Sequence, residues 1–166
     1  MLGRAVLAVV LALQPLFLLP VHACAALYTT WTGIEVDKCA SSWLIVRFVD
    51  KDAEFKVVQG GTSPKDGTPF DTPYAKLRRY SSMTTFDTIR NEYKIKGEAL
   101  DRLALIIRDI ELNAWANKVT QEAIGLDTII RGLDIVVEDD VECMKKSWIV
   151  FDALHAALNH KTGENK

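Results

Sequence analysis

Four side chains with chemical potential lie within a single short stretch of the sequence. They are a carboxylate, an indole, a guanidinium and a second carboxylate: Asp37, Trp43, Arg47 and Asp50. A helix over about 41–50 advances about 100° per residue and places Trp43, Arg47 and Asp50 on one side. The opposite side of the same helix is apolar and must be buried. The stretch therefore predicts a helix that combines a core-facing surface with a stacking ring beside a fixed positive charge.

Two interpretations of Arg47 are open from its spacing. It could pair with Asp50 at i,i+3, a contact worth about 0.2–0.5 kcal/mol on a helix. Composition alone favours this pair, because charged pairs on helices are common. Alternatively, Arg47 could belong to an anion or ligand site, since the guanidinium fork matches the geometry of oxyanions.

Two further candidates follow in and after a loop. Residues 60–73 are rich in Gly, Pro, Ser, Thr and Asp, which is typical of a loop, and loops inside compact domains often carry function. Within it, Asp71 either caps a turn or faces a site. Arg79 ends a small basic cluster that is typical of a solvated surface.

The remaining candidates lie on two helices of the second half. Arg108 and Glu111 are spaced i,i+3 near the end of a helix expected at 98–110, where they form either an ordinary pair or part of a site. Glu122 lies in the first turn of a helix that Thr120 could cap. A carboxylate there either favours the helix dipole or serves a site.

Hydrophobic periodicity predicts the elements that position these side chains. The fold class is α+β and mainly helical, as a single domain of about five helices around a small two-stranded sheet. The strands are expected at 28–31 and 54–58, and the helices at about 41–50, 84–93, 98–110, 120–131 and 138–158.

The N-terminus has the features of a secretory signal. A positive residue precedes a nearly unbroken apolar run that is shorter than the ~20 residues of a membrane span. We therefore expect residues 1–26 to be a signal peptide, residues 27–160 to be the folded domain, and residues 161–166 to be a polar, disordered tail. The protein would be periplasmic or secreted, with no membrane span after cleavage. A lipoprotein anchored through Cys24 is the alternative.

Composition disfavours some partners and names no cofactor. The formal net charge is −2, so the chain lacks the basic footprint of a nucleic-acid-binding protein. No Gly-rich phosphate loop, paired CxxC or HExxH motif is present. Cys39 and Cys143 remain after signal cleavage, and they either pair in an oxidising compartment or act as small buried hydrophobes.

The run from Asp37 to Asp50 also resembles the opening signature of the chromate-resistance domain, the C-terminal domain of ChrB-type proteins. Further segments resemble this family in the same order, over about residues 29–158. They are Ala53-Glu54-Phe55, Thr68-Pro69-Phe70-Asp71-Thr72-Pro73, Phe86-Asp87, 106–112, Glu122-Ala123-Ile124-Gly125-Leu126, Asp139-Asp140 and Phe151-Asp152-Ala153-Leu154. Several motifs in the right order are more specific than one short match.

The sequence departs from the family pattern at positions that could matter chemically. Arg79 stands where the family usually has a His, and Thr84 stands where a nearby Cys is usual. Ser41-Ser42 replaces the usual Cys-Pro. If the family site uses a thiol or an imidazole, this chain has lost part of it.

The resemblance implies an exported bacterial chromate-resistance and stress-response protein. We expect a periplasmic ligand-binding or sensing module for an oxyanion or a metal-linked small ligand, with the site gathered around Trp43. Two alternatives stay open: a carboxylate-site, metal-assisted enzyme, and a scaffold that has lost its site and binds a protein partner. The expected ligand-binding residues are Asp37, Trp43, Arg47, Asp50, Asp71, Arg79, Arg108, Glu111 and Glu122.

Overall fold

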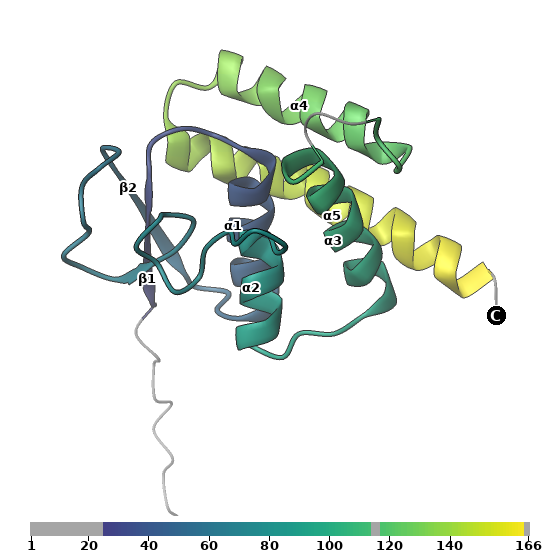
Figure 1. Ribbon diagram of the computed structural model, residues 1–166, viewed down its shortest axis with the longest axis horizontal. Coiled ribbons are helices and arrows are strands. Elements are labelled where there is room, and N and C mark those ends of the chain that lie inside the picture. Colours follow the sequence, from purple (N-terminus) through teal and green to yellow (C-terminus); the bar gives the residue numbers. More distant parts are fainter. Residues whose placement is uncertain (1–24, 114–116, 165–166) are drawn as a thin grey trace, which may run out of the picture.

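The computed structural model describes residues 25–113 and 117–164, with side chains to residue 160. Within these residues, five helices pack beside a small three-stranded parallel sheet (Figure 1). The fold is therefore mainly helical α+β, as predicted. The elements are β1 (Leu27–Trp31), α1 (Val36–Phe48), β2 (Glu54–Val58), β3 (Thr68–Pro69), α2 (Thr85–Glu92), α3 (Glu98–Glu111), α4 (Glu122–Val136) and α5 (Asp140–Glu164).

The sheet has one strand more than predicted. Its order is β2-β1-β3, and β1 pairs in parallel with both neighbours. The additional strand, β3, consists of Thr68 and Pro69 inside the predicted loop. Two residues are too few to show alternating hydrophobicity, and proline argues against a central strand but is tolerated at an edge. This explains why the sequence pattern indicated two strands.

Helix α1 is the centre of the fold (Figure 1), where it contacts α2, α3, α4 and α5. It starts at Val36 and ends at Phe48, so the predicted helix at 41–50 was placed too late. Asp37 occupies its first turn, where a carboxylate favours the helix dipole. Residues 36–46 are all buried, so α1 has no solvent-facing side along that length. The predicted division into an apolar face and a polar face is therefore wrong.

The other helix boundaries follow the predicted pattern with shifts. A capping box is present at the start of α2, between Thr84 and Asp87. Helix α4 starts later than predicted, because the Thr120 hydroxyl donates to Asp109 Oδ2 at 2.7 Å instead of capping α4. It then continues through Gly132 to Val136. Helix α5 runs to Glu164, into the segment predicted as a tail.

Trp43 and Arg47 together hold α1 against α5. Trp43 is 1% exposed, and its indole contacts the rings of Phe48 and Phe151. Its Nε1 donates to Asp152 Oδ1 at 2.7 Å. Arg47 adds a bidentate pair, with Nε and Nη2 donating to the two oxygens of Asp152 at 2.9 and 2.8 Å. This carboxylate on α5 therefore joins both side chains of α1.

The predicted pair between Arg47 and Asp50 is wrong, because α1 ends before Asp50. The Asp50 carboxylate instead accepts from the backbone N–H of Ala26 at 2.9 Å, which fixes the start of β1. Cys39 and Cys143 are both buried and form no disulfide. None of the helices in the described part of the chain is long and apolar enough to cross a membrane.

Replacing Asp152 with alanine should lower the free energy of unfolding by about 1–3 kcal/mol, because the buried Trp43 Nε1–H loses its acceptor. Chemical denaturation of both proteins measures the difference. Asp66→Ala is the matched control, since it removes an exposed pair with Lys56 and should cost less than about 1 kcal/mol. Equal losses in the two variants would contradict this role for Asp152.

Candidate functional site

The carboxylate of Asp37 joins the start of α1 to the start of α2. It is fully buried, and its Oδ2 and Oδ1 accept from the backbone N–H groups of Thr85 and Phe86 at 2.7 and 2.9 Å. These two donors belong to the first turn of α2, where backbone N–H groups have no partner within the helix. Asp37 therefore satisfies the N-terminus of α2 from another element of the fold.

Arg79 lies among three carboxylates, two from the start of α1 and one from the end of α3. Its Nη2 is 2.9 Å from Glu35 and 2.8 Å from Glu111, and its Nε is 3.5 Å from Asp37 Oδ2. Glu111 also accepts from the backbone N–H of Asp37 at 3.0 Å. The end of α3, the start of α1 and the loop before α2 thus meet at one guanidinium.

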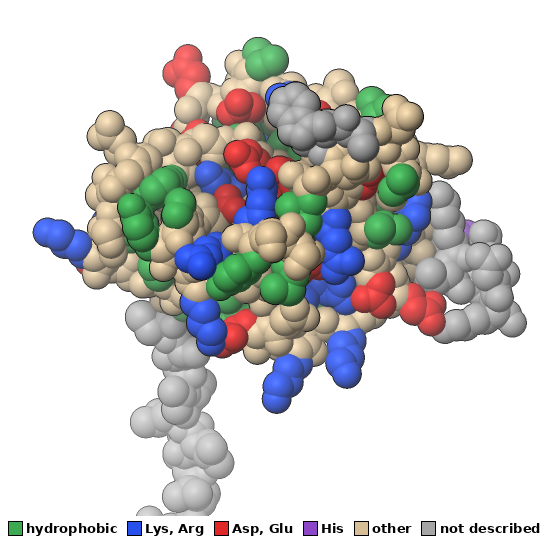
Figure 2. Space-filling model, in the orientation of Figure 1, with side chains coloured by type: hydrophobic (Ala, Val, Ile, Leu, Met, Phe, Trp, Pro, Cys, Tyr) green, Lys and Arg blue, Asp and Glu red, His purple; other side chains and the backbone are tan. Residues whose placement is uncertain are grey.

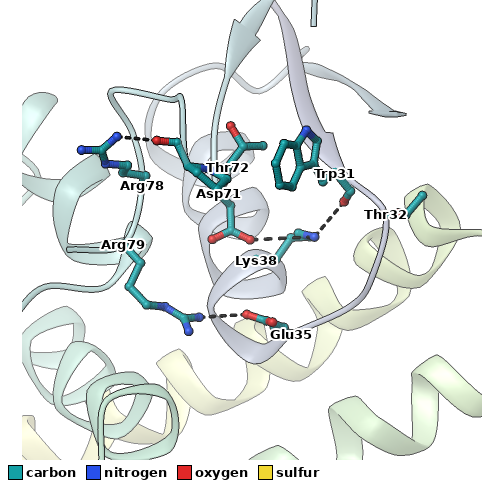
Figure 3. Close-up of a pocket in the computed structure, with 9 residues that line it drawn as sticks. Trp31, Thr32, Glu35, Lys38, Asp71, Thr72, Arg78 and Arg79 are labelled. Carbon is teal, nitrogen blue, oxygen red and sulfur yellow. Dashed lines mark hydrogen bonds and ion pairs between the residues drawn. The ribbon is translucent and has the colours of Figure 1, made fainter. Parts of the chain in front are cut away.

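An open cleft of about 630 Å³ adjoins this network (Figure 3). We name it the Lys38 cleft. Lys38 donates to the backbone carbonyls of Trp31, at 2.8 Å, and Gly33. An ammonium has three N–H groups, and Lys38 uses two of them for these carbonyls. Its Nζ is 3.9 Å from Asp71 Oδ2, which makes an ion pair but is too long for a hydrogen bond. The cleft is lined by Trp31, Thr32, Glu35, Lys38, Asp71, Thr72, Pro73, Arg78 and Arg79.

Two neighbouring residues of the loop give the cleft its remaining polar character. Asp71 has a φ of 51°, a left-handed conformation that Asp tolerates better than most residues. Its Oδ1 accepts from the Thr85 hydroxyl at 2.7 Å. The Thr72 hydroxyl is buried and has no hydrogen-bond partner within the described residues. Within the described residues, the cleft therefore combines a lysine that is held in place with a buried hydroxyl that makes no hydrogen bond.

The buried carboxyl groups are harder to ionise than free ones. Burial and the charge of Asp71 raise the pKa of Asp37 to about 7, against the lowering effect of the N–H groups of α2. Burial raises the pKa of Asp71 to about 6, although Lys38 opposes this shift. Burial also raises the pKa of Glu111. Near neutral pH, the cluster is therefore close to gaining or losing protons.

The structure brings together four of the nine predicted site residues and separates the other five. Asp37, Asp71, Arg79 and Glu111 belong to the network at the start of α1. Trp43, Arg47 and Asp50 lie elsewhere, at the contact of α1 with α5 and in the turn after α1. Arg108 pairs with Asp87 at 2.6 Å, and Glu122 pairs with Arg102 at 2.9 Å.

The expectation of one cavity around Trp43 is therefore wrong. Trp43 instead faces the core, and the carboxylate that its indole contacts belongs to Asp152 on α5, 109 residues away in sequence. The Arg108–Glu111 pair is likewise replaced by contacts with Asp87 and Arg79. Whether any of the nine residues binds a ligand stays a prediction.

Sequence reasoning missed seven of the nine residues that line the cleft: Trp31, Thr32, Glu35, Lys38, Thr72, Pro73 and Arg78. A signal for Lys38 existed. With α1 starting at Val36, this lysine lies in the first turn, where a cation opposes the helix dipole. Such a position indicates a special partner, which here is the pair of carbonyls at the end of β1. The later predicted start of the helix concealed this signal.

One family model, described as the C-terminal domain of ChrB, matches residues 28–158. The chain belongs to the ChrB C-terminal-domain family. The network of Asp37 and Arg79 and the Lys38 cleft both lie within the matched range. No curated protein and no solved structure matches the chain. Membership makes this a chromate-resistance, ChrB-like domain.

The side chains present in this ChrB C-terminal domain bear on which ligands could bind. Acidic and basic side chains lie next to one another in the middle of the face shown in Figure 2. Among the described residues, no group of three or more His, Cys, Asp or Glu side chains could hold a metal ion. Hydrogen bonding and charge from the Lys38 cleft are what this site offers a ligand.

The raised pKa of Asp71 makes the stability of this ChrB C-terminal domain depend on pH. The folded protein holds this proton more tightly than the unfolded chain, whose ordinary value is 3.8. The stabilisation is complete below that value and is lost as pH rises through about 6. Asp71→Asn should therefore gain stability relative to the wild type between about pH 5 and about pH 8.

Denaturant titrations at both pH values measure that change. Asp109 supplies the control, because its hydrogen bonds lower its pKa to about 2. Asp109 therefore stays ionised in this pH range. The difference in unfolding free energy between wild type and Asp109→Asn should be the same at both pH values. If the difference in unfolding free energy between wild type and Asp71→Asn is also the same at both pH values, the raised pKa does not belong to Asp71.

Proposed function

We propose that this ChrB C-terminal domain is an exported ligand-binding or sensing module that takes a small oxyanion in the Lys38 cleft. One observation supports the proposal: Lys38, held by two backbone carbonyls and ion-paired with Asp71 at 3.9 Å, lines the same cleft as Arg78 and Arg79. The N-terminal segment on which export rests lies outside the described residues. Export is therefore supported by the signal-like pattern of the sequence.

The cationic groups of the cleft suit an anion in different ways. The carbonyls of Trp31 and Gly33 hold the Lys38 ammonium in place, so its charge is already oriented. Arg78 and Arg79 line the same cleft, and guanidinium groups match the oxygens of a tetrahedral anion.

Acidic groups at the same cleft make the binding depend on protons. Asp71 and Glu35 also line it, and their negative charges oppose an anion. When Asp71 is protonated, its charge disappears and it becomes a hydrogen-bond donor. Because its pKa lies at about 6, oxyanion binding should take up a proton near neutral pH. Linkage then requires affinity to increase as pH falls.

Thermal unfolding with and without sulfate or chromate tests the proposal. A ligand at about one hundred times its Kd stabilises the fold by about 2.7 kcal/mol, so the wild-type Tm should rise. Lys38→Met keeps the aliphatic stem but removes the charge, and its Tm should not respond. Lys145→Met is the matched control, since Lys145 lies in a different cleft and should leave the response unchanged.

Arg78→Gln is the second variant, because it leaves the contacts of Lys38 intact and remains informative if Lys38→Met does not fold. Its Tm response should be smaller than that of the wild type. A wild-type Tm that no oxyanion raises would reject the proposal. A rise in Tm as large as that of the wild type in both Lys38→Met and Arg78→Gln would also reject the proposal.

The pH dependence of affinity is a separate prediction. Sulfate keeps its charge across this range, so a change in its affinity reports on the protein. Its Kd, measured by calorimetry, should decrease as pH is lowered from about 8 to about 5. Asp71→Asn should remove most of this dependence. An equal slope in the two proteins would show that another group takes up the proton.

A carboxylate-site enzyme is the second candidate, and a specific observation favours it. Asp37 and Glu111 contact Arg79, Asp71 lies beside Lys38, and burial raises the pKa of each of these three carboxyl groups. Asp37 is enclosed, whereas Asp71 lines the cleft and could exchange a proton with a substrate. In that case Asp71→Asn would abolish turnover while keeping ligand binding. A pure binding module would show no turnover in either protein.

A further inference from the structure

A second open cleft lies where α2 passes into α3, and we name it the α2–α3 cleft. It has a volume of about 360 Å³ and is lined by residues of both helices and of the connection between them. Lysine and arginine side chains gather over this part of the molecule in Figure 2, where Figure 1 places α2 and α3. The charged lining residues are four cations and two carboxylates: Arg90, Lys94, Lys96 and Arg108, with Asp87 and Asp101. The cleft is therefore basic, although the net charge of the chain is −2.

Both carboxylates of the α2–α3 cleft are paired with its arginines. The buried Asp87 accepts from Nε and Nη2 of Arg108 at 2.7 and 2.6 Å. Asp101 accepts from Nη2 of Arg90 at 2.5 Å. The Arg90 side chain is only 11% exposed, whereas that of Arg108 is 45% exposed. The two guanidinium groups are thus held in place, and Arg108 presents a fixed, partly exposed charge.

The two lysines of the cleft have no such partner. Lys94 and Lys96 are exposed, and neither makes a hydrogen bond or an ion pair with any described residue. Lys94 comes directly after the C-cap of α2, where a cation favours the helix dipole. Lys96 directly precedes Gly97, the N-cap of α3, where the dipole opposes a cation. A bound anion would offset that repulsion.

The N-terminus of α3 adds to the attraction for an anion. Its N-cap is Gly97, which provides no side-chain cap for the first backbone N–H groups of the helix. Such groups have no partner within the helix and favour negative charge. Lys96 and Asp101, on either side of this terminus in sequence, both line the cleft. The terminus therefore reinforces a positive charge that the lysines and arginines already supply.

We propose that the α2–α3 cleft binds a small, non-aromatic molecule with two phosphate groups, of which inorganic pyrophosphate is the simplest. Two ammonium and two guanidinium groups around one cleft match a ligand with several negative charges better than a single tetrahedral dianion. None of the described residues that line the cleft is aromatic, so a nucleobase would have no ring to stack on. The cleft shares no residue with the Lys38 cleft, so this site is separate from the proposed function.

An NMR titration of the protein with pyrophosphate measures affinity at this cleft directly. The backbone amide signals of residues 94–97 should shift in a saturable way. The signal of Gly97 is followed in every variant, because this residue is unchanged. In the double variant Lys94→Gln/Lys96→Gln, the Kd from the Gly97 signal should rise at least about tenfold, since two of the four positive charges are lost. Circular dichroism confirms that this variant is folded.

A second double variant is the matched control. Lys65→Gln/Lys146→Gln removes the same net charge from two exposed lysines that lie outside this cleft. At physiological ionic strength, exposed charges more than about 8 Å apart are largely screened from one another. The Kd of this control should therefore be close to that of the wild type.

Three results would overturn the proposal. The first is a Gly97 signal that pyrophosphate does not shift in a saturable way. The second is an equal rise of Kd in the two double variants, which would show general charge attraction without a site. The third is a lower Kd for a single-stranded oligonucleotide than for pyrophosphate, which would assign the cleft to nucleic acid. The indole signal of Trp31 reports on the Lys38 cleft in the same spectra, so a failure at either cleft is recognised separately.

Discussion

The buried carboxylate of Asp37 is the interaction on which the arrangement of this domain depends. Burying a charge is costly unless hydrogen bonds and opposite charges compensate it. Here the compensation comes from the backbone N–H groups at the N-terminus of α2 and from the guanidinium of Arg79. These partners come from segments that are distant in sequence. The carboxylate therefore fixes where α2 and the loop before it lie relative to α1.

The Lys38 cleft is a consequence of that constraint. Asp37 holds the start of α1, so its neighbour Lys38 faces the other way, toward the end of β1. Arg79, held by Glu35 and Glu111, then forms one wall of the cleft. The loop after β3 supplies the remaining wall, with Asp71 turned inward by its left-handed backbone. Lys38 and Arg79 are thus held in place by contacts with other residues of the protein.

Helix α1 carries a second polar cluster with a different role. At its C-terminal half, Trp43 and Arg47 share the carboxylate of Asp152 on α5. That cluster joins two helices across the core, and the indole within it has no free polar edge. The two clusters lie at opposite ends of one buried helix. This separation explains how the same helix can both hold the fold together and orient a site.

Periodicity predicted the elements well, because the burial of helix faces and strands leaves a local pattern. The strands at 28–31 and 54–58 and the helices at 84–93 and 98–110 all depend on neighbours in sequence. The site depends on contacts between distant segments. Arg47 and Asp50 are close in sequence, yet the partner of Arg47 is 105 residues away. Local spacing therefore suggested the wrong pair.

The same reasoning explains which site residues were found. Asp71 and Glu111 were predicted as separate candidates from their chemical types, and Arg79 from its place in the family pattern. Nothing local indicated that they converge, because that depends on how α3 and the loop pack against α1. Lys38 was missed because the start of α1 was placed five residues late. With the correct helix start, Lys38 would lie in the first turn, where a cation opposes the helix dipole. That position would have identified Lys38 as a candidate.

The most direct test of the central claim is an NMR titration with sulfate that follows the tryptophan indole N–H signals. The account predicts that the indole of Trp31, at the Lys38 cleft, shifts in a saturable way. The indoles of Trp43 and Trp148, which donate to Asp152 and Ser42, should not move. A Trp31 signal that stays fixed while Trp43 shifts would contradict the account and return the site to the other end of α1.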